Sequence, residues 1–428
     1  MSYTEGFMSI EQDFKLFSGN SFSELFANDI QDGKYGYYVS YPSTAGWSHF
    51  PNNQKYLIQD GNSEESKVPY NKTAQMEPWR VLSVMGDDIP AILMEKPSDP
   101  LLTYWREHFG FKYDNLDVYP HQNIFNELNE SDKYDKILSL FPFDHLKKEK
   151  HAIDPDEHYR LLSKVTLAEM GVHYPKFTHY DLTQVDISQV KVPDEYPFLV
   201  KVSHGLAGEG TYIIRNQEDL DFCSIDIRQY IKAGLVRTVL VSEFVLNEVG
   251  NYCVQFYVDR EGKATLLGAT NQMVTEDGEM IGGVIRYSDT MEKFQHKIAV
   301  LSRFLHKHGY FGVVGVDVLE NAEGEMFVID ANIRINGSTP LCVLRRNLQQ
   351  EKKEYAKFST GYSVDCSLDE AMVRLHRDLE HKDFVIVSAN EYIEDKKLKT
   401  HIYGIIAGET LDQMFAIENR LRMLGVHG

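Results

Sequence analysis

Three polar side chains near the end of segment 312–338, GVVGVDVLENAEGEMFVIDANIRINGS, could act together on a metal ion and a phosphoryl group. Asp330, Asn332 and Arg334 occupy alternate positions of an expected strand, so their side chains project from the same face. Carboxylate and amide oxygens suit Mg²⁺, which also takes water and phosphate oxygens as ligands. Arg334 could neutralise a transferring phosphoryl or acyl-phosphate group.

A second carboxylate, Asp317, precedes the turn of this expected hairpin. If Leu319 lies opposite Met326, Asp317 becomes a diagonal neighbour of Asp330 on the polar face, whereas a slip of one residue would separate them. The alternative is an exposed hairpin with alternating polar residues. It is disfavoured because the other face is apolar, with Val314, Val316, Val318, Phe327, Ile329 and Ile333.

Lys201 ends the strand-like run PFLVKV and is followed by a loop containing Gly205, Gly208 and Gly210. Glycines allow backbone N–H groups to turn toward an anion, so the loop could close over phosphates. A strand follows the loop and no Gly-Lys-Ser/Thr is present, which excludes a P-loop. An ordinary glycine-rich hairpin with a surface lysine explains this segment equally well when it is considered alone.

The segment 238–255, TVLVSEFVLNEVGNYCVQ, could hold a nucleoside. Its first strand ends around Glu243, Phe244 and Val245, where free backbone groups could pair with an adenine edge. Glu248 or Asn251 could bind ribose hydroxyls. A plain hairpin with a solvated glutamate is the default explanation without the other two motifs.

Two further residues are weaker candidates. Arg286, in GGVIRYSD, could bind an anionic substrate or stabilise the transferred phosphate, but a surface arginine fits equally well. His204, beside the glycine loop, could contact substrate, although a polar loop residue is the simpler interpretation.

The elements that must position these residues are mostly strands. Between 196 and 345, seven runs rich in Val, Ile and aromatics predict strands: 197–202, 211–214, 238–245, 252–258, 264–271, 312–319 and 326–333. A helix is expected over about 291–308, and another over 156–170, with Asp154 or Asp156 as its cap and Gly171 at its end. The helix 99–109 should end at Gly110.

Composition limits the class of protein. The 428 residues contain 43% hydrophobic residues, which predicts several packed units. The net charge of −20 disfavours nucleic acid as a partner. Without a run of ~20 apolar residues or a signal-like N-terminus, we expect a soluble, cytoplasmic protein with no membrane partner. Four scattered cysteines favour neither a zinc site nor a disulfide framework.

In this order, the lysine strand with its glycine loop, the hinge strand and the acidic hairpin resemble the ATP-grasp superfamily over about residues 155–345. The resemblance implies an α+β class, in which two ATP-grasp lobes with antiparallel sheets follow an α/β domain and precede a small α/β extension. The expected domains are 1–150 for the N-terminal α/β domain, 151–250 for the linker helix and glycine-loop lobe, 251–348 for the metal lobe, and 349–428 for the C-terminal extension.

The resemblance also implies roles for individual residues. Those expected at the nucleotide are Lys201, His204, Gly205, Gly208, Gly210, Glu243, Phe244, Val245, Glu248 and Asn251, with either Arg160 or Lys164 as a further phosphate contact. Those expected at magnesium are Asp317, Asp330 and Asn332. Those expected in catalysis are Arg334, Arg286 and Lys201. The segment IRINGSTP most resembles the amino-acid and peptide ligases of the superfamily.

The implied activity is an ATP- and Mg²⁺-dependent carboxylate–amine ligase, with Mn²⁺ as an alternative metal. It would activate a small carboxylic acid as an acyl phosphate and join it to an amine, releasing ADP and phosphate. A thiol acceptor, a carboxylase or kinase reaction, a nucleotide-binding regulatory module without turnover and a structural interaction protein are the alternatives. A homodimer is the assembly suggested by relatives.

Overall fold

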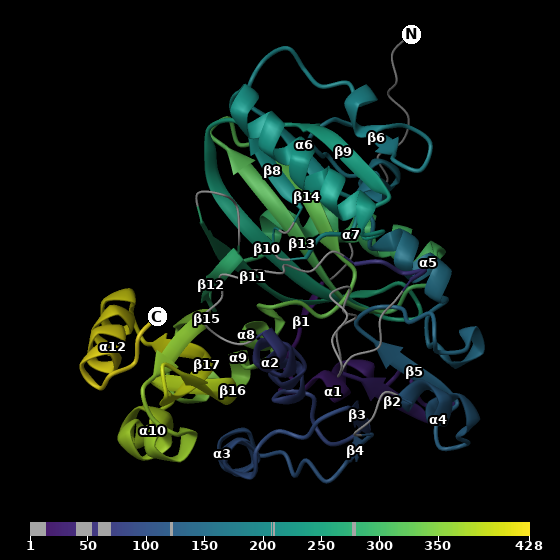
Figure 1. Ribbon diagram of the computed structural model, residues 1–428. Helices are drawn as coiled ribbons and strands as arrows, with labels where there is room; N and C mark the ends of the chain where they lie inside the picture. Colours follow the sequence, from purple (N-terminus) through teal and green to yellow (C-terminus); the bar gives the residue numbers. More distant parts are fainter. Residues whose placement is uncertain are drawn as a thin grey trace.

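The computed structural model describes residues 14–39, 54–58, 70–119, 123–206, 208, 210–275 and 280–428. Residues 1–13, on which the absence of a signal sequence was judged, lie outside these ranges. Within the described ranges the longer strands form three sheets, with helices packed against them (Figure 1). The combination of antiparallel sheets and helices confirms the expected α+β class.

The largest sheet has nine strands and supports the candidate metal hairpin. Its order is β14-β13-β10-β11-β12-β15-β17-β16, and the short β1 (Lys15–Leu16) pairs with β11. The C-terminal strands thus extend the same sheet. The bounds are β10 Glu248–Val258, β11 Ala264–Val274, β12 Met280–Arg286, β13 Gly312–Asn321, β14 Met326–Asn332, β15 Tyr355–Val364, β16 Phe384–Glu394 and β17 Lys397–Gly408.

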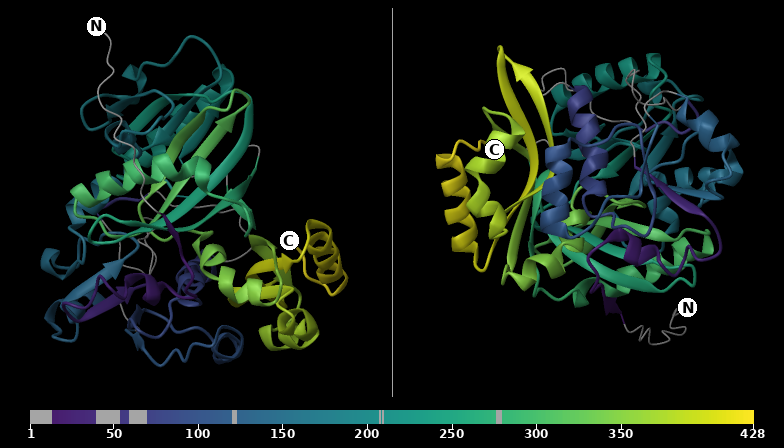
Figure 2. Two further views of the ribbon diagram at one scale, coloured as in Figure 1. Left: turned by 180° about the vertical axis from the view of Figure 1, so that it is seen from behind. Right: turned by 90° about the horizontal axis from the view of Figure 1, so that it is seen from below.

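Helices cover this sheet along its length. Helix α7 (Gln295–Lys307) packs on β10 and β11 through residues spaced three or four apart, including Ile298, Leu301 and Leu305. This confirms the helix expected over 291–308, apart from a 3₁₀ turn in its first residues. The remaining helices are α8 Thr339–Val343, α9 Arg345–Gln350, α10 Leu368–Arg374, α11 His376–Glu380 and α12 Leu411–Met423; Figure 2 shows α12 at the outer edge of the molecule.

A smaller antiparallel sheet positions Lys201. Its order is β6-β9-β7-β8, with bounds Phe177–Asp181, Thr238–Glu243, Phe198–Val202 and Thr211–Ile214 respectively. On β7, Phe198, Val200 and Val202 face a core shared with helix α6 (Gln217–Lys232), a helix that the sequence analysis did not anticipate. Because side chains alternate along a strand, Lys201 projects from the opposite face.

The N-terminal part contains a parallel sheet of order β4-β3-β2-β5. Helices lie between its strands in sequence, as expected for an α/β unit. Helix α3 ends at Gly110, whose φ of 80° confirms the predicted stop. The bounds are α1 Phe22–Phe26, β2 Tyr35–Tyr38, α2 Tyr70–Leu82, β3 Ala91–Leu93, α3 Asp99–Phe109, β4 Leu116–Val118, α4 Ile124–Glu130 and β5 Lys136–Ser139.

The predicted helix 156–170 is wrong as a single element. Helix α5 spans Pro155–Leu161, with Asp154 as its cap, and a 3₁₀ helix follows over Lys164–Glu169. One local and one long-range hydrogen bond coincide with the break. The Ser163 side chain accepts the backbone N–H of Val165, and the N–H of Lys164 donates to the carbonyl of Ser203. Lys164 is thereby turned toward the lysine strand and its loop.

The expected register of the metal hairpin is also wrong by one residue. Leu319 pairs with Phe327, and the register shifts between Asp317 and Val318, so that Asp317 lies directly opposite Asp330. The extra residue is a β-bulge, which the turn sequence does not reveal. Consequently Val328 and Ala331 enter the core on β14, while Phe327 and Ile329, expected there, are only partly buried. Both carboxylates still project from the polar face.

In the described part of the chain, none of the helices is both long enough and apolar enough to cross a membrane.

Candidate active site

Two carboxylates and an amide meet on the paired strands β13 and β14, and a side chain of β11 reaches them across β10. Asp317 and Asp330 are cross-strand partners, and the Asn332 Nδ2 donates to Asp317 Oδ2 over 3.1 Å. From β11, Gln272 Nε2 donates to Asp317 Oδ1 over 2.7 Å. Burial and the neighbouring Asp330 carboxylate raise the pKa of Asp317, and the hydrogen bond from Gln272 opposes this shift. The pair therefore favours a bound cation.

Lys164 supplies one such cation from the linker. Its Nζ lies 2.9 Å from Asp330 Oδ2 and 3.3 Å from the carbonyl oxygen of Gly205, so it connects the metal hairpin to the glycine loop. Only 7% of Lys164 is exposed. A buried ion pair of this kind is favourable only with good geometry and further hydrogen bonds, and Lys164 has both.

Lys201 is a second buried cation beside the same carboxylates. Burial, followed by repulsion from Lys164, lowers its pKa to about 8, and Asp330 and Asp317 oppose this shift. Among the described residues, no carboxylate lies within ion-pair distance of Lys201 Nζ. A polyanionic ligand at this position would raise the pKa of the amine again and supply its missing counterion.

Arg334 is fixed at the end of the polar face. Its Nη2 donates to Asn332 Oδ1 over 2.8 Å and its Nη1 to the Ile335 carbonyl over 3.0 Å. The guanidinium lies 4.9 Å from the ring centroid of Phe141, which comes from the N-terminal part. A planar cation held in this way is preorganised for an anionic group and loses little freedom on binding.

The donor set fits Mg²⁺ bound to a nucleotide. Asp317, Asp330 and Asn332 supply three oxygen-bearing groups, and Mg²⁺ completes its shell with phosphate and water oxygens. Within the described ranges there is no group of three His, Cys, Asp or Glu that would form an all-protein site. Asp317 and Asp330 face each other, and a lysine, Lys164, pairs with Asp330 alone. A divalent cation fits here because it would balance the remaining negative charge.

The glycine loop lies next to this cluster. Gly208 and Gly210 have φ of 94° and 67°, and a Cβ on Gly210 would stand 2.3 Å from the Val202 side chain. Gly210 is therefore required for the loop to return onto the lysine strand. Residues 207 and 209 lie outside the described part of the loop.

His204 anchors the loop. Its Nε2 donates to the Tyr159 carbonyl, its Nδ1 accepts from Ser203 Oγ, and its ring stacks 4.0 Å from that of Tyr159. Burial lowers the pKa of His204 to about 4, so the ring is neutral at pH 7. These contacts assign both ring nitrogens to the protein, which fits the simpler interpretation given above.

The predicted nucleoside contacts follow β9 and begin β10. Glu243 accepts the N–H of Lys176 at its carboxylate, and Phe244 and Val245 are half-buried beyond the strand end. Asn251 lies two positions before Cys253, the sheet partner of Asp317, and therefore faces the same side. Its Oδ1 is buried and has no hydrogen-bond partner in the described structure.

Glu248 begins β10 close to this amide. Burial raises its pKa, which a hydrogen bond with Asn251 opposes. Because Asn251 also has a buried acceptor without a donor, a ligand hydroxyl would fit here, and both residues remain candidates for it.

Two predicted residues lie apart from the cluster. Arg160 Nη1 and Nη2 donate to Glu169 and Glu157. Arg286 is exposed, 3.7 Å from Glu354 and 3.8 Å from Asp289 in ion-pair geometry. The contacts therefore favour Lys164 over Arg160 as the phosphate contact, and no hydrogen bond or ion pair joins Arg286 to Arg334 among the described residues.

A pocket opens between the cluster and the N-terminal part. Lys164, Gly205, Asp330, Asn332 and Arg334 form its polar side, and its apolar side is formed by Ile58, Phe141, Leu162 and Leu206. Sequence motifs could not have identified the apolar group, because Ile58 and Phe141 belong to segments without a motif. Gln272 was missed for the same reason.

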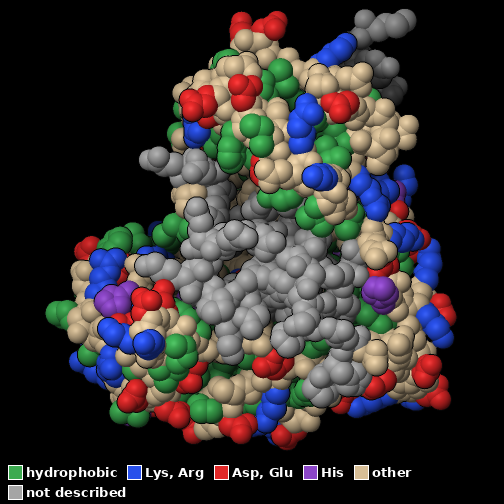
Figure 3. Space-filling view, in the orientation of Figure 1, with side chains coloured by type: hydrophobic (Ala, Val, Ile, Leu, Met, Phe, Trp, Pro, Cys, Tyr) green, Lys and Arg blue, Asp and Glu red, His purple; other side chains and the backbone are tan. Residues whose placement is uncertain are grey.

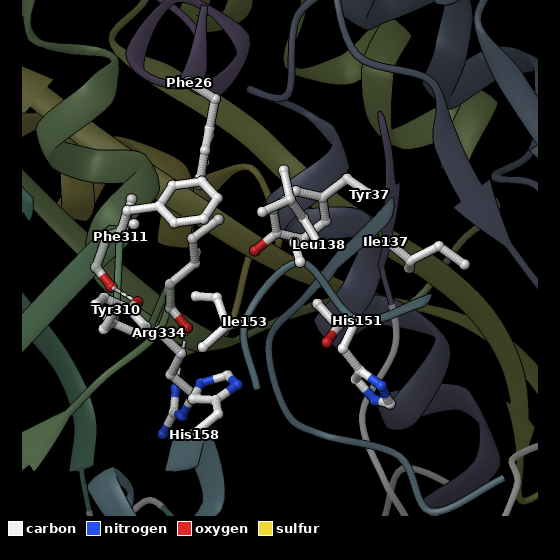
Figure 4. Close-up of a pocket in the computed structure, with 15 residues that line it drawn as sticks. Phe26, Tyr37, Ile137, Leu138, His151, Ile153, His158, Tyr310, Phe311 and Arg334 are labelled. Atoms are coloured by element: carbon white, nitrogen blue, oxygen red, sulfur yellow. Dashed lines mark hydrogen bonds between the residues drawn. The ribbon is translucent and has the colours of Figure 1, made fainter. Parts of the chain in front are cut away.

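Arg334 also lines a second pocket, which Figure 4 shows between the parallel sheet and β13. Its other walls are mainly apolar, from Phe26, Tyr37, Leu138 and Phe311. Arg334 therefore separates two pockets.

On the described part of the face in Figure 3, Lys and Arg are interspersed with Asp and Glu.

Comparison with known proteins decides the family. Residues 175–332 match the family model described as the ATP-grasp domain of L-aspartate–L-methionine ligase. The matched segment is therefore an ATP-grasp domain of a ligase family, which confirms the expected resemblance. The matched range includes Lys201, the glycine loop, Asp317 and Asp330.

Solved structures share the fold. An N5-carboxyaminoimidazole ribonucleotide synthetase in complex with ADP is 12% identical, with a TM-score of 0.51 over 81% of this chain and 93% of that one. Biotin carboxylase from Campylobacter jejuni is 12% identical, with a TM-score of 0.50 over 78% and 91%. L-amino acid ligase from Bacillus licheniformis is 11% identical, with a TM-score of 0.50 over 92% and 97%.

The position of Lys164 predicts how it differs from Arg160. Replacing Lys164 with Met should weaken binding of MgATP by roughly 10- to 100-fold, because a charge-assisted contact is lost. Arg160→Met should change the dissociation constant by less than about twofold, since its partners are Glu157 and Glu169. Isothermal titration calorimetry measures both, and equal losses in the two variants would contradict the assignment.

The lowered pKa of Lys201 predicts a pH dependence. MgATP affinity should fall as the pH rises through about 8, where the amine loses its charge, and Lys201→Arg should remove this dependence. The folded pKa lies below the usual 10.5, so the contribution of Lys201 to folding stability should increase from about pH 8 to 10.5. Calorimetry between pH 7 and 9 tests the first effect; a constant affinity in the native protein would oppose it.

Proposed function

We propose that this ATP-grasp protein joins the carboxylate of one small molecule to the amine of another, forming an amide through an acyl phosphate. ADP and phosphate are the other products. The observation that carries the proposal is the single cluster in which Asp317, Asp330 and Asn332 adjoin Lys164 and Arg334. A cluster with this composition suits phosphoryl transfer to a carboxylate, where positioning and charge neutralisation supply most of the catalysis.

The residues divide this work. Lys164 and Lys201 neutralise phosphate oxygens, and the buried position of both amines strengthens that attraction. Asp317, Asp330 and Asn332 hold magnesium, which when bound offsets the charge on the nucleotide phosphates. Arg334 holds the carboxylate that is to be phosphorylated and stabilises the charge that develops on it.

Exclusion of water is the second requirement, because an acyl phosphate would otherwise be hydrolysed. Phe141, Leu162 and Leu206 line the apolar side of the first pocket and would keep water from the reacting groups. Closure of the glycine loop over the phosphates would complete the enclosure. The amine then attacks the acyl carbon, the C–O bond to phosphate breaks, and the proton of the amine leaves with solvent or phosphate.

Amino acids are the substrates we propose. The matching family model is named for L-aspartate and L-methionine, and a structure with the same fold is an L-amino acid ligase. These two amino acids are therefore the first pair to test, followed by the remaining amino acids as pools.

The decisive experiment incubates the purified protein with ATP, Mg²⁺, L-aspartate and L-methionine, and detects ADP and the dipeptide by mass spectrometry. Asp330→Ala should reduce amine-dependent ADP formation by at least ~100-fold, because it removes a ligand of the magnesium that would offset the phosphate charge. Asp412→Ala, an exposed change at the start of α12, is the control.

Each alternative outcome has a distinct meaning. Full turnover by Asp330→Ala would contradict the site. ADP formed only with a thiol, or without any acceptor, would replace the proposed amine by another chemistry. Tight ATP binding without ADP under every substrate mixture would indicate a regulatory module.

A further inference from the structure

Helix α9 begins with a buried arginine that has no counterion among the described residues. Arg345, the first residue of that helix, is only 7% exposed, and its Nε is fully buried without a hydrogen-bond partner. Its guanidinium lies 5.5 Å from the ring centroid of Tyr287. Throughout the described ranges no carboxylate comes within ion-pair distance of it.

Two other buried cations in the described part of the chain have acidic partners. Arg80 pairs with Glu77, and Lys353 pairs with Asp383. Burying a charge without such a partner strongly disfavours folding, and an unpaired buried group in a native protein calls for an explanation. An anionic ligand would provide the missing partner of Arg345.

A second unpaired polar atom belongs to the strand that pairs with β11 at Gly268. Arg345 Nη2 stands 3.1 Å from the position that a Cβ on Gly268 would occupy. The sheet partner of Gly268 is Gln255, which is fully buried and donates from Nε2 to Ser338 Oγ over 2.9 Å. Its Oε1 has no donor among the described residues.

Together these two groups match the ends of an α-amino acid. Arg345 offers N–H donors and positive charge, which suit a carboxylate, and Gln255 Oε1 offers an acceptor for an N–H group. A phosphate would satisfy the arginine but not the amide oxygen. The complementary pair therefore favours an amino acid over inorganic phosphate.

The location relative to the reacting groups is suitable. Gly268 and Gln272 lie four positions apart on β11, hence on the same face, and Gln272 contacts Asp317. At ~3.3 Å per residue the separation along the strand is about 13 Å. An acyl phosphate near Asp317 and an amino acid whose amine attacks the acyl carbon can together span this distance.

We propose that Arg345 binds the carboxylate of the amino acid that supplies the amine, and that Gln255 orients this amino acid. The inference rests on the proposed function and names the class of its second substrate. Acceptors with a free carboxylate are thus preferred to their amides. In contrast to Arg334, which meets the carboxylate that is phosphorylated, Arg345 contacts one that does not react.

The test compares L-methionine with L-methioninamide as acceptors in the ligation assay. In the native protein the amide should lower kcat/KM by at least ~10-fold, because it cannot pair with the buried charge. Arg345→Met should lower kcat/KM for L-methionine by a similar factor, mainly through KM, and leave that for L-methioninamide nearly unchanged. Arg346→Met, at the exposed neighbouring position, is the matched control.

The melting temperature and a second variant distinguish a folding defect from the loss of substrate binding. Because Arg345→Met removes an unpaired buried charge, its melting temperature should be equal to or above that of the native protein. Arg345→Lys keeps the charge and should retain part of the preference for L-methionine. Equal losses for both acceptors in Arg345→Met, or no preference in the native protein, would overturn the proposal.

Failure of the proposed function can be distinguished from failure of this inference. If no ligation occurs, the melting temperature is measured with L-methionine, L-methioninamide or inorganic phosphate, each with MgADP present. The site is supported, even if no ligation occurs, when L-methionine raises the melting temperature and the other two compounds do not. This effect should be absent in Arg345→Met. Equal stabilisation by phosphate, or none by L-methionine, counts against it.

Discussion

The apposition of two carboxylates across one strand pair determines how the rest of this site is built. Asp317 and Asp330 face each other in partly buried surroundings, and their repulsion must be balanced by positive charge. Lys164 supplies part of that balance through its contact with Asp330. The remaining negative charge makes the site suited to a divalent cation. Lys201 and Arg334 carry the positive charge that anions bound with this cation would need.

Three local features of the fold bring these charged groups together. A bulge in the hairpin places the carboxylates directly opposite each other, and the 3₁₀ turn after α5 directs Lys164 toward them. The close return of Gly210 onto Val202 keeps the loop next to the lysine strand. The N-terminal part contributes Phe141, which holds Arg334, so this part completes the site rather than only covering it.

Much of this could be predicted because it depends on short-range patterns. The period of two placed Asp330, Asn332 and Arg334 on one face, and apolar runs located the strands that carry them. The bulge and the break at Ser163 could not be predicted, because each depends on hydrogen bonds to residues distant in sequence. Arg160 and Lys164 were indistinguishable for the same reason: only the contact with Ser203 decides which of them turns inward.

The residues that no motif revealed are those whose proposed role depends on their burial and on their neighbours in the fold. Gln272 and Arg345 are ordinary in sequence, and only their burial and their partners, or the lack of one, give them a role. The surroundings of Gln272 and Arg345 therefore indicate roles that the family resemblance does not imply.

The most direct measurement of the central claim is a crystal structure with Mn²⁺ and a non-hydrolysable ATP analogue, in which anomalous scattering locates the metal. A peak is expected between β13 and β14, at about 2.0–2.4 Å from a carboxylate oxygen of both Asp317 and Asp330, with Lys164 turned from Asp330 to a phosphate. A nucleotide whose metal touches neither carboxylate, or one bound away from this hairpin, would contradict it.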